Sequence, residues 1–430
     1  MDWKYIFEKA INGVPNPKRI QELEKVGTEM REEWIIYSLQ QYITQFSVSD
    51  EDIKQIEEYC IECEKFYQQN QRLRNYHFGY PANMLERTPL YNIFLEYERL
   101  GFLSNNCGDT FEKGNYRMDS KEIEKDILEM FAHKFGIDKK PYWGYITSGG
   151  SESNSWGIEN GFRFYPKGIL YYSESAHYSI KKYAEKYRSI CIPQASPTDE
   201  AINNNVLFEM VRSNPNPVIL VLTWGTTKFG SCDDVFQIIS TLKKEGREFY
   251  IHVDAALYGG IPNNQIDAPI IKIDGEEIDS ISVSLHKYIG VPFVKSVLLS
   301  TRKPNCEIVP YIGVTDSTTS GSRDILPFSM RQQVFDVLNL TDKGEYAKNI
   351  NLFERLLNEQ RIPYIRSGKG NIFVVDKPSD DLCQKYQLST FEINVDGKKI
   401  NKAHIIIFPY QVETIIFELV HDLSKERGVL

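Results

Sequence analysis

The sequence predicts an α/β fold with a mostly parallel sheet in a large domain, followed by a small C-terminal α+β domain. Between residue 76 and about residue 325, strand-like and helix-like segments alternate, as a parallel sheet with helical crossovers requires. Residues Val218–Thr223 form an unbroken apolar run, which is typical of a strand buried on both faces. After residue 326 a second, shorter set of helices and strands follows.

These patterns divide the chain into three parts: an N-terminal helical segment (1–75), a large domain (76–325) and a small C-terminal domain (326–430). The first part either packs across a partner subunit or is a separate protein-binding appendage. Helices are expected in it at 20–26, 34–42 and 50–69, the last with Ser49 as its N-cap. In the third part we expect helices at 330–340, 352–357 and from 411 onward, and strands at 371–375 and 403–408.

Composition limits the class of protein. The 430 residues include 50 Lys and Arg against 59 Asp and Glu, a net charge of −9 without basic clusters, which argues against a nucleic-acid partner. Seven cysteines, of which only Cys60 and Cys63 are closely spaced, indicate free thiols and a reducing compartment. With no apolar run of membrane-spanning length and no signal sequence, we expect a soluble, cytoplasmic protein without a structural metal.

Lys287 is the first candidate functional residue. The preceding segment, 279–284, alternates small polar and β-branched residues as a short strand does, and Gly290 follows soon after. A lysine amine attacks an aldehyde only when it is unprotonated, so burial or a neighbour such as His286 must lower its pKa. The alternative is a His-Lys pair in a solvated turn.

Asp254 is the second candidate. A strand at 247–251 places it at the carboxyl end of a sheet, where ligands of open α/β sheets bind. Two alanines follow it and leave room for a flat ring. An aspartate facing a pyridine nitrogen keeps that nitrogen protonated, and the ring then withdraws electrons. The alternative is an aspartate that caps the next turn.

Two further motifs lie between strands and helices. Gly149 and Gly150 follow the apolar stretch 143–146 and precede an expected helix, so their backbone N–H groups can bind one phosphate monoester. The segment lacks the features of a P-loop or a dinucleotide fold, and a simple tight turn is the alternative. His177 stands in a strand-to-helix loop, where its imidazole can lie flat on a cofactor ring or can be a surface or capping residue.

A phosphate loop, a stacking histidine, an Asp-x-Ala and a Ser-x-His-Lys occur in this order, and the chain thereby resembles the group II amino-acid decarboxylases. These are pyridoxal-phosphate enzymes with the aspartate-aminotransferase fold. Within them, the chain is most similar to bacterial histidine decarboxylases and plant serine decarboxylases. The matching stretches are Phe78–Pro81, Asn105–Asp109, Asn115–Tyr116, Trp143–Tyr145, Gly149–Gly150, Tyr171–Ser173, His177–Ser179, Gly225–Thr227, Asp254–Ala256, His286–Lys287 and Gly321–Arg323.

The resemblance implies decarboxylation of an L-amino acid to its amine with pyridoxal 5′-phosphate, in a homodimer with composite active sites. The expected catalytic residues are Lys287, His177, Tyr311 and His286, with Tyr311 on a mobile loop from the neighbouring subunit or His286 as the acid that protonates Cα. The expected cofactor-binding residues are Gly149, Gly150, Ser151, His177, Thr226, Asp254, Ala256, Ser284, His286, Lys287 and Ser322. The expected substrate-binding residues are Tyr80, Asn106 and Leu326.

One segment departs from the family pattern. In the histidine and serine decarboxylases, Gly-Ser-Arg is followed by Asn-Gly-His, whereas here it is followed by Asp324-Ile325-Leu326. If this segment lines the substrate pocket, the pocket is more apolar than theirs, which argues against histidine as the substrate. The resemblance implies histidine, and another neutral amino acid is the alternative. An aldehyde-forming decarboxylase–oxidase, another pyridoxal-phosphate lyase and a non-catalytic binding protein are the alternatives.

Overall fold

The computed structural model describes residue 36 and residues 39–45, 49–84, 105–137, 141–262, 278–340, 345–368 and 370–428. The chain forms two compact units, 1–76 and 77–430, and each is described by itself. The helix expected at 20–26 lies outside the described residues. Of the helix expected at 34–42, residues 36 and 39–42 are described, and they are helical.

The main described element of the first unit is helix α4 (Asp50–Arg74). Ser49 is its N-cap, as predicted: the Ser49 hydroxyl accepts a hydrogen bond from the Asp52 N–H, and the Asp52 carboxylate accepts one from the Ser49 N–H. The acidic residues of the first turn add a favourable interaction with the positive end of the helix dipole.

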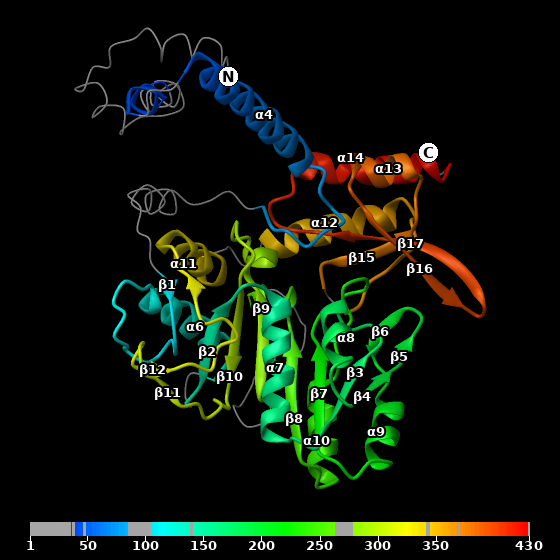
Figure 1. The fold of residues 1–430 in the computed structure, drawn as a ribbon. Coiled ribbons are helices and arrows are strands. Elements are labelled where there is room, and N and C mark those ends of the chain that lie inside the picture. Colours follow the sequence, from blue (N-terminus) through cyan, green and yellow to red (C-terminus); the bar gives the residue numbers. More distant parts are fainter. Residues whose placement is uncertain are drawn as a thin grey trace. The chain divides into compact units, whose positions relative to one another are not determined.

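The second unit is built on a seven-stranded sheet of order β2-β10-β9-β8-β7-β3-β4 (Figure 1). Strand β10 runs antiparallel to both its neighbours, and the other strands of this sheet are parallel to one another. The predicted mostly parallel sheet is therefore confirmed. In chain order its strands are β2 (Trp143–Thr147), β3 (Ile169–Ser173), β4 (Ser189–Ile192), β7 (Val218–Thr223), β8 (Phe249–Asp254), β9 (Ser280–Ser284) and β10 (Ser296–Ser300).

Helices cover this sheet, and its central strands are therefore buried. Every residue of β7 is buried, as its unbroken apolar run predicted. Helix α7 lies along one face, in contact with β7, β8, β9 and β10 (Figure 1). The helices of this part are α6 (Lys121–Phe135), α7 (Gly150–Phe164), α8 (Tyr178–Ala184), α9 (Asn204–Arg212), α10 (Val235–Lys244) and α11 (Phe328–Phe335), with a 3-10 turn at Tyr258–Gly260 and π turns at Leu285–Ile289 and Asp336–Leu340.

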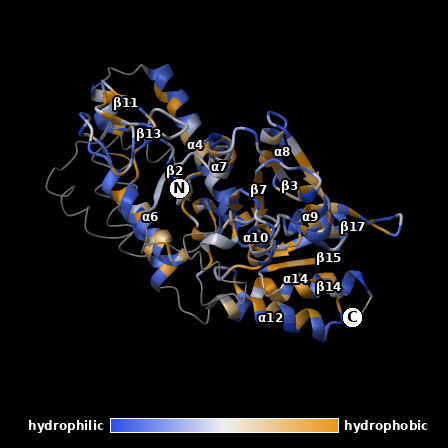
Figure 2. Ribbon diagram, turned by 90° about the horizontal axis from the view of Figure 1, so that it is seen from below, coloured by the Kyte–Doolittle hydropathy of each residue, from blue (hydrophilic) through white to orange (hydrophobic). Residues whose placement is uncertain are grey.

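A four-stranded antiparallel sheet of order β14-β15-β17-β16 follows toward the C-terminus. Strand β15 has the hydrophobic colour in Figure 2, and helices α12 and α14 contact each other beside this sheet. The expected strands at 371–375 and 403–408 correspond to β15 and the end of β17. The elements are α12 (Glu345–Glu359), β14 (Tyr364–Ile365), β15 (Ile372–Asp376), α13 (Asp380–Lys385), β16 (Ser389–Val395), β17 (Lys398–Ile406) and α14 (Glu413–Glu426).

Three two-stranded antiparallel pairs complete the described elements. They are β1 (Asn105–Asn106) with β13 (Arg323–Asp324), β5 (Gln194–Ser196) with β6 (Asp199–Ile202), and β11 (Ile308–Val309) with β12 (Val314–Thr315).

Residues 78–83 form a strap between the small sheet and the large one. At one end, Phe78 donates its N–H to the Tyr386 carbonyl (3.2 Å) and accepts from the Ile406 N–H (2.7 Å). At the other end, Asn83 donates its N–H to the carbonyl of Lys287 (2.9 Å) and its side-chain amide to that of Tyr288 (2.7 Å). The small sheet is thus connected by hydrogen bonds to the backbone of the candidate lysine.

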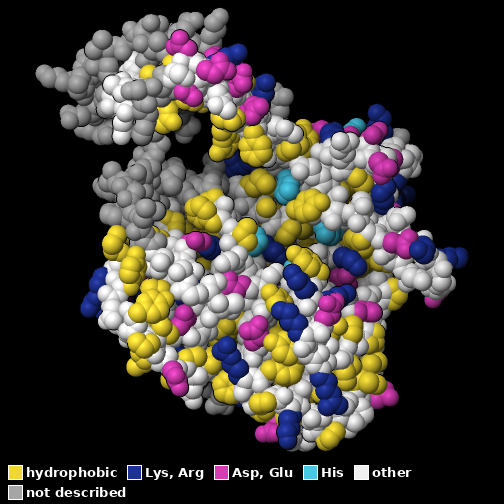
Figure 3. All heavy atoms as spheres, viewed as in Figure 1, with side chains coloured by type: hydrophobic (Ala, Val, Ile, Leu, Met, Phe, Trp, Pro, Cys, Tyr) yellow, Lys and Arg dark blue, Asp and Glu magenta, His cyan; other side chains and the backbone are white. Residues whose placement is uncertain are grey.

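The surface carries both signs of charge. On the face drawn in Figure 3, acidic and basic side chains are interspersed among apolar ones. None of the helices described in the chain is both long enough and apolar enough to cross a membrane.

Candidate active site

A cavity of about 440 Å³ opens at the carboxyl ends of the parallel strands. Its walls come from the segments that follow β2, β3, β7, β8 and β9, because strands of one direction end at the same edge of a sheet. The lining residues are Ser148, Gly149, Gly150, Ser151, Glu152, Asn154, Ser175, His177, Tyr178, Thr223, Gly225, Thr227, Asp254, Ala256, Ser284, His286, Lys287 and Val294. The cavity therefore brings together four motifs that are up to 138 residues apart in the chain (Gly149 to Lys287).

Lys287 lies in the π turn that connects β9 to β10. Its side chain lines the cavity, and burial lowers the pKa of its amine, an effect that the nearby carboxylate of Asp254 partly offsets. A lowered pKa raises the fraction of unprotonated, nucleophilic amine. Lys295, the nearest lysine in the following strand segment, is instead held in an ion pair with Asp324.

Asp254 ends strand β8 with its side chain buried. One carboxylate oxygen accepts the Ala256 N–H (3.1 Å), and the other accepts the side-chain amide of Asn154 (2.8 Å). These two hydrogen bonds hold the carboxylate in one orientation at the cavity.

The glycine loop between β2 and α7 has the shape of an anion cradle. Gly149 has φ +141°, a conformation that side chains disfavour, and a Cβ on Gly150 would lie 3.1 Å from the Ser284 hydroxyl. Helix α7 begins at Gly150, so the first N–H groups of the helix have no partners within it. Glu152 binds the N–H of Ser148 (2.8 Å), which keeps the loop folded back on the helix.

Two histidines face the same cavity. His177 caps helix α8: its Nδ1 accepts the Ser179 N–H (3.3 Å), so a ring proton on the neutral imidazole resides on Nε2. The Nδ1 of His286 lies 3.3 Å from the Lys295 carbonyl, which only accepts, so this nitrogen carries the proton. Burial lowers the pKa of both imidazoles and favours their neutral forms.

Some of the residues predicted for the site do not line this cavity. The Thr226 hydroxyl accepts the Ser231 N–H, and its neighbour Thr227 lines the cavity instead. Tyr311 is 79% exposed, on the β11–β12 hairpin. Ser322 is exposed, and Tyr80 is exposed and stacks on His77, so the roles assigned to these residues stay predictions.

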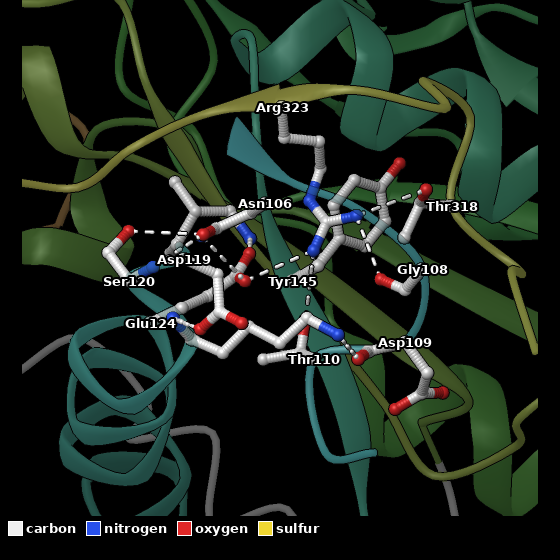
Figure 4. A network of polar contacts seen from close by, with 12 residues as sticks. Asn106, Gly108, Asp109, Thr110, Asp119, Ser120, Glu124, Tyr145, Thr318 and Arg323 are labelled. Atoms are coloured by element: carbon white, nitrogen blue, oxygen red, sulfur yellow. Dashed lines mark hydrogen bonds and ion pairs between the residues drawn. The ribbon is translucent and has the colours of Figure 1, made fainter. Parts of the chain in front are cut away.

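Asn106 belongs to a buried polar network around Arg323 (Figure 4). Leu326, the other predicted substrate contact, is buried and is joined to this network by its backbone N–H. Arg323 pairs with Glu124 (3.1 Å), to which Asn106 also donates (3.3 Å). Ser120 donates its N–H to Asn106 (2.7 Å) and accepts the N–H of Leu326 (2.7 Å). Asn106 is thus occupied by protein partners and Leu326 is packed, so their assignment to substrate stays a prediction.

The prediction from sequence omitted Asn154, which lines the cavity, and His252, which is buried beside it. Asn154 links to Asp254, and His252 Nε2 lies 3.0 Å from the Asn154 carbonyl. The sequence could have indicated His252, because His252 and Asp254 are two residues apart in a strand and therefore lie on the same face of it. Asn154 likewise lies one helical turn after Gly150, the first residue of α7.

Comparison with known proteins identifies the family. The pyridoxal-dependent decarboxylase conserved domain matches residues 159–333. Serine decarboxylase 2 of Oryza sativa subsp. japonica is 34% identical over 376 residues, covering 84% of this chain and 77% of the relative. Histidine decarboxylase of Vibrio campbellii is 31% identical over 409 residues, covering 89% and 98%. The chain belongs to the pyridoxal-dependent decarboxylases.

Solved structures agree on the fold. The L-methionine decarboxylase of Streptomyces sp. 590 superposes with a TM-score of 0.73 at 20% identity, covering 88% of this chain and 96% of that one. The predicted aspartate-aminotransferase-like fold is therefore confirmed. As a carboxy-lyase of this family, the protein uses pyridoxal 5′-phosphate.

The residues of the cavity fit that cofactor. Lys287 supplies an amine for the aldehyde, Asp254 a carboxylate for the pyridine nitrogen, and the loop at Gly149 and Gly150 backbone N–H groups for the phosphate. The Gly150 Cβ position, 3.1 Å from Ser284, is open only because the residue is glycine. The imidazole of His177 lines the same cavity and could stack on the face of the pyridine ring.

Proposed function

We propose that the protein decarboxylates histidine or another neutral L-amino acid to its amine. The observation that carries this proposal is the meeting of Lys287, whose amine has a lowered pKa, with the buried carboxylate of Asp254 in one cavity. When bound, the cofactor supplies a protonated ring that accepts the electrons left at Cα as CO₂ departs.

The chain's own residues divide the remaining work. Lys287 would supply the amine that holds the cofactor aldehyde, and Asp254 would face its pyridine nitrogen. His177 would cover one face of the ring and leave the other face to the substrate. The N–H groups at the start of α7 would hold the phosphate.

The proton for Cα comes from Tyr311 or His286. The Nδ1 proton of His286 is directed to the Lys295 carbonyl, and its lowered pKa leaves Nε2 without a proton. Tyr311 carries a phenol on an exposed hairpin and is the better donor. Because Tyr311 does not line the cavity of its own chain, we propose a homodimer in which it completes the site of the partner.

We also propose a cytoplasmic location for the enzyme. This proposal is supported by the seven cysteines, which are all free, as is usual in a reducing compartment.

The test begins with the full-length protein, loaded with cofactor and incubated with a pool of the proteinogenic amino acids. Mass spectrometry should find one new amine, formed in equal amount to CO₂ and without hydrogen peroxide. Peroxide with an aldehyde product would assign the aldehyde-forming reaction instead.

The lysine assignment has its own test. Borohydride reduction followed by peptide mapping should place the pyridoxyl group on Lys287, and Lys287→Ala should abolish turnover while the fold persists. Lys295→Ala is the matched control and should retain the label at Lys287. A label on Lys295 in the wild-type protein would refute the assignment.

A further inference from the structure

Asn154, which lines the cavity, is the centre of a buried polar network. It lies in helix α7, is buried, and contacts β8, β9 and α8 through its side chain. Its amide nitrogen donates to Asp254 (2.8 Å) and Ser179 (3.4 Å). Its carbonyl oxygen accepts from His252 (3.0 Å) and Ser282 (3.0 Å). All the hydrogen-bonding positions of the amide are thus used.

The direction of these hydrogen bonds follows from a single charge. The ionised carboxylate of Asp254 only accepts, so the amide nitrogen of Asn154 must face it. The carbonyl of Asn154 then faces His252, whose Nε2 must carry the proton, and Nδ1 accepts from the Ser280 hydroxyl (2.8 Å). The Ser280 hydroxyl in turn accepts from Tyr250 (3.0 Å). Every donor in this chain points toward Asp254.

A second branch reaches the other side of the cavity. The Ser179 hydroxyl, which accepts from Asn154, lies 2.8 Å from Nδ1 of His177. Because Nδ1 also accepts the Ser179 N–H, the hydroxyl donates to it. One amide is therefore connected to both the carboxylate and the imidazole that face the cofactor site.

We propose that Asn154 is a positioning residue that fixes the carboxylate of Asp254 against the pyridine nitrogen of the cofactor and, through Ser179, the ring of His177 against its face. This inference rests on the proposed function. Asn154 acts through Asp254 and does not contact the reacting atoms. Loss of the amide removes one of the two hydrogen bonds that hold the carboxylate, which is then freer to rotate.

Helix α7 is packed to allow this contact. A Cβ on Gly157 would lie 2.3 Å from Nδ1 of His252, so only glycine lets the helix approach β8 closely enough for Asn154 to bridge. The geometry of the network therefore depends on helix packing as well as on its polar groups.

The experiment measures cofactor binding by the full-length protein after the cofactor has been removed. Two ligands are compared by fluorescence titration: pyridoxal 5′-phosphate, and its analogue with C–H in place of the ring nitrogen. Asn154→Leu should weaken the binding of pyridoxal 5′-phosphate about tenfold to a hundredfold, the usual effect of losing a hydrogen bond to a charged group. It should weaken binding of the analogue, which Asp254 cannot hold, far less.

Two further variants provide an alternative substitution at Asn154 and a control at another buried asparagine. Asn154→Ser, whose shorter side chain cannot reach Asp254 and leaves space for water, should show the same selective loss if Asn154→Leu does not fold. Asn349→Leu is the matched control, because Asn349 is a buried asparagine that donates to three backbone carbonyls of the small domain. It should lower the melting temperature without changing either affinity.

The outcomes separate the two proposals. An equal loss for both ligands in Asn154→Leu and Asn154→Ser would show a merely structural role, and no loss would also overturn the inference. A wild-type protein that fails to bind pyridoxal 5′-phosphate would instead contradict the proposed function.

Discussion

His252 shows how a single residue combines stability with function. It lies within strand β8, fully buried, and burial lowers its pKa from the ordinary 6.5 to about 4. Its neutral ring holds the carbonyl of Asn154, and the protonated ring would place a charge in the core. The site thus needs this histidine to stay neutral.

This pKa predicts a pH dependence of stability. Between pH 6.5 and pH 4 the unfolded chain binds a proton at His252 that the folded chain does not, so stability is lost as the pH falls through this window. At pH 5 the loss from this residue is about 2 kcal/mol. Urea denaturation at pH 7 and pH 5 should therefore show a smaller decrease for His252→Gln than for the wild type.

The exposed His421 supplies the control. His421→Gln should leave the decrease between pH 7 and pH 5 unchanged. An identical decrease in His252→Gln and the wild type would mean that His252 does not contribute.

At the scale of elements, the network around Arg323 joins β13 to helix α6 and strand β2. Glu124, in α6, binds both Arg323 (3.1 Å) and the N–H of Ile146 in β2 (2.7 Å). The guanidinium also lies over the ring of Tyr145, 5.4 Å from its centre. The segment before Leu326 is thereby fixed to the large domain.

Removing one partner of the Arg323–Glu124 ion pair should destabilise the folded protein. Arg323→Met leaves the Glu124 carboxylate buried without its cation, and the free energy of unfolding should fall by about 3–5 kcal/mol. Adding Glu124→Gln, which still accepts from Ile146, should restore part of the loss. Glu122→Gln breaks the more exposed Lys125–Glu122 pair and should change stability by less than about 1 kcal/mol in the same urea experiment. Equal effects at both pairs would contradict this account.

The elements also show which features the sequence could predict. Strand β7 and the ends of β8 and β9 follow from apolar pattern and position, and they place Asp254 and Lys287 correctly. The antiparallel direction of β10 could not be predicted from the sequence, because an apolar run has the same pattern in either direction. Asn154 was missed because a polar residue in a helix resembles a solvated one until the sheet that buries it is known.

At the scale of the whole molecule, the exposed Tyr311 leads to a test of subunit cooperation. If Tyr311 completes the site of the partner subunit, then mixing inactive Lys287→Ala with inactive Tyr311→Phe should yield hybrid dimers with one intact site. Activity should recover toward about a quarter of the wild-type level after subunit exchange, the share of sites expected for random pairing. Exchange shown by mass spectrometry without any recovery would mean that each chain completes its own site.

The strap at 78–83 connects the lysine turn to the small sheet. Its hydrogen bonds join Phe78 to Ile406 at one end and Asn83 to Lys287 at the other, so we expect the two regions to open together. Hydrogen–deuterium exchange can test this, because it measures how often each backbone amide opens to solvent. Ligand bound at Lys287 slows local opening of the turn, and the amide of Ile406 should therefore exchange more slowly although it lies in a different sheet. We therefore expect the small sheet to respond to the occupancy of a site that it does not line.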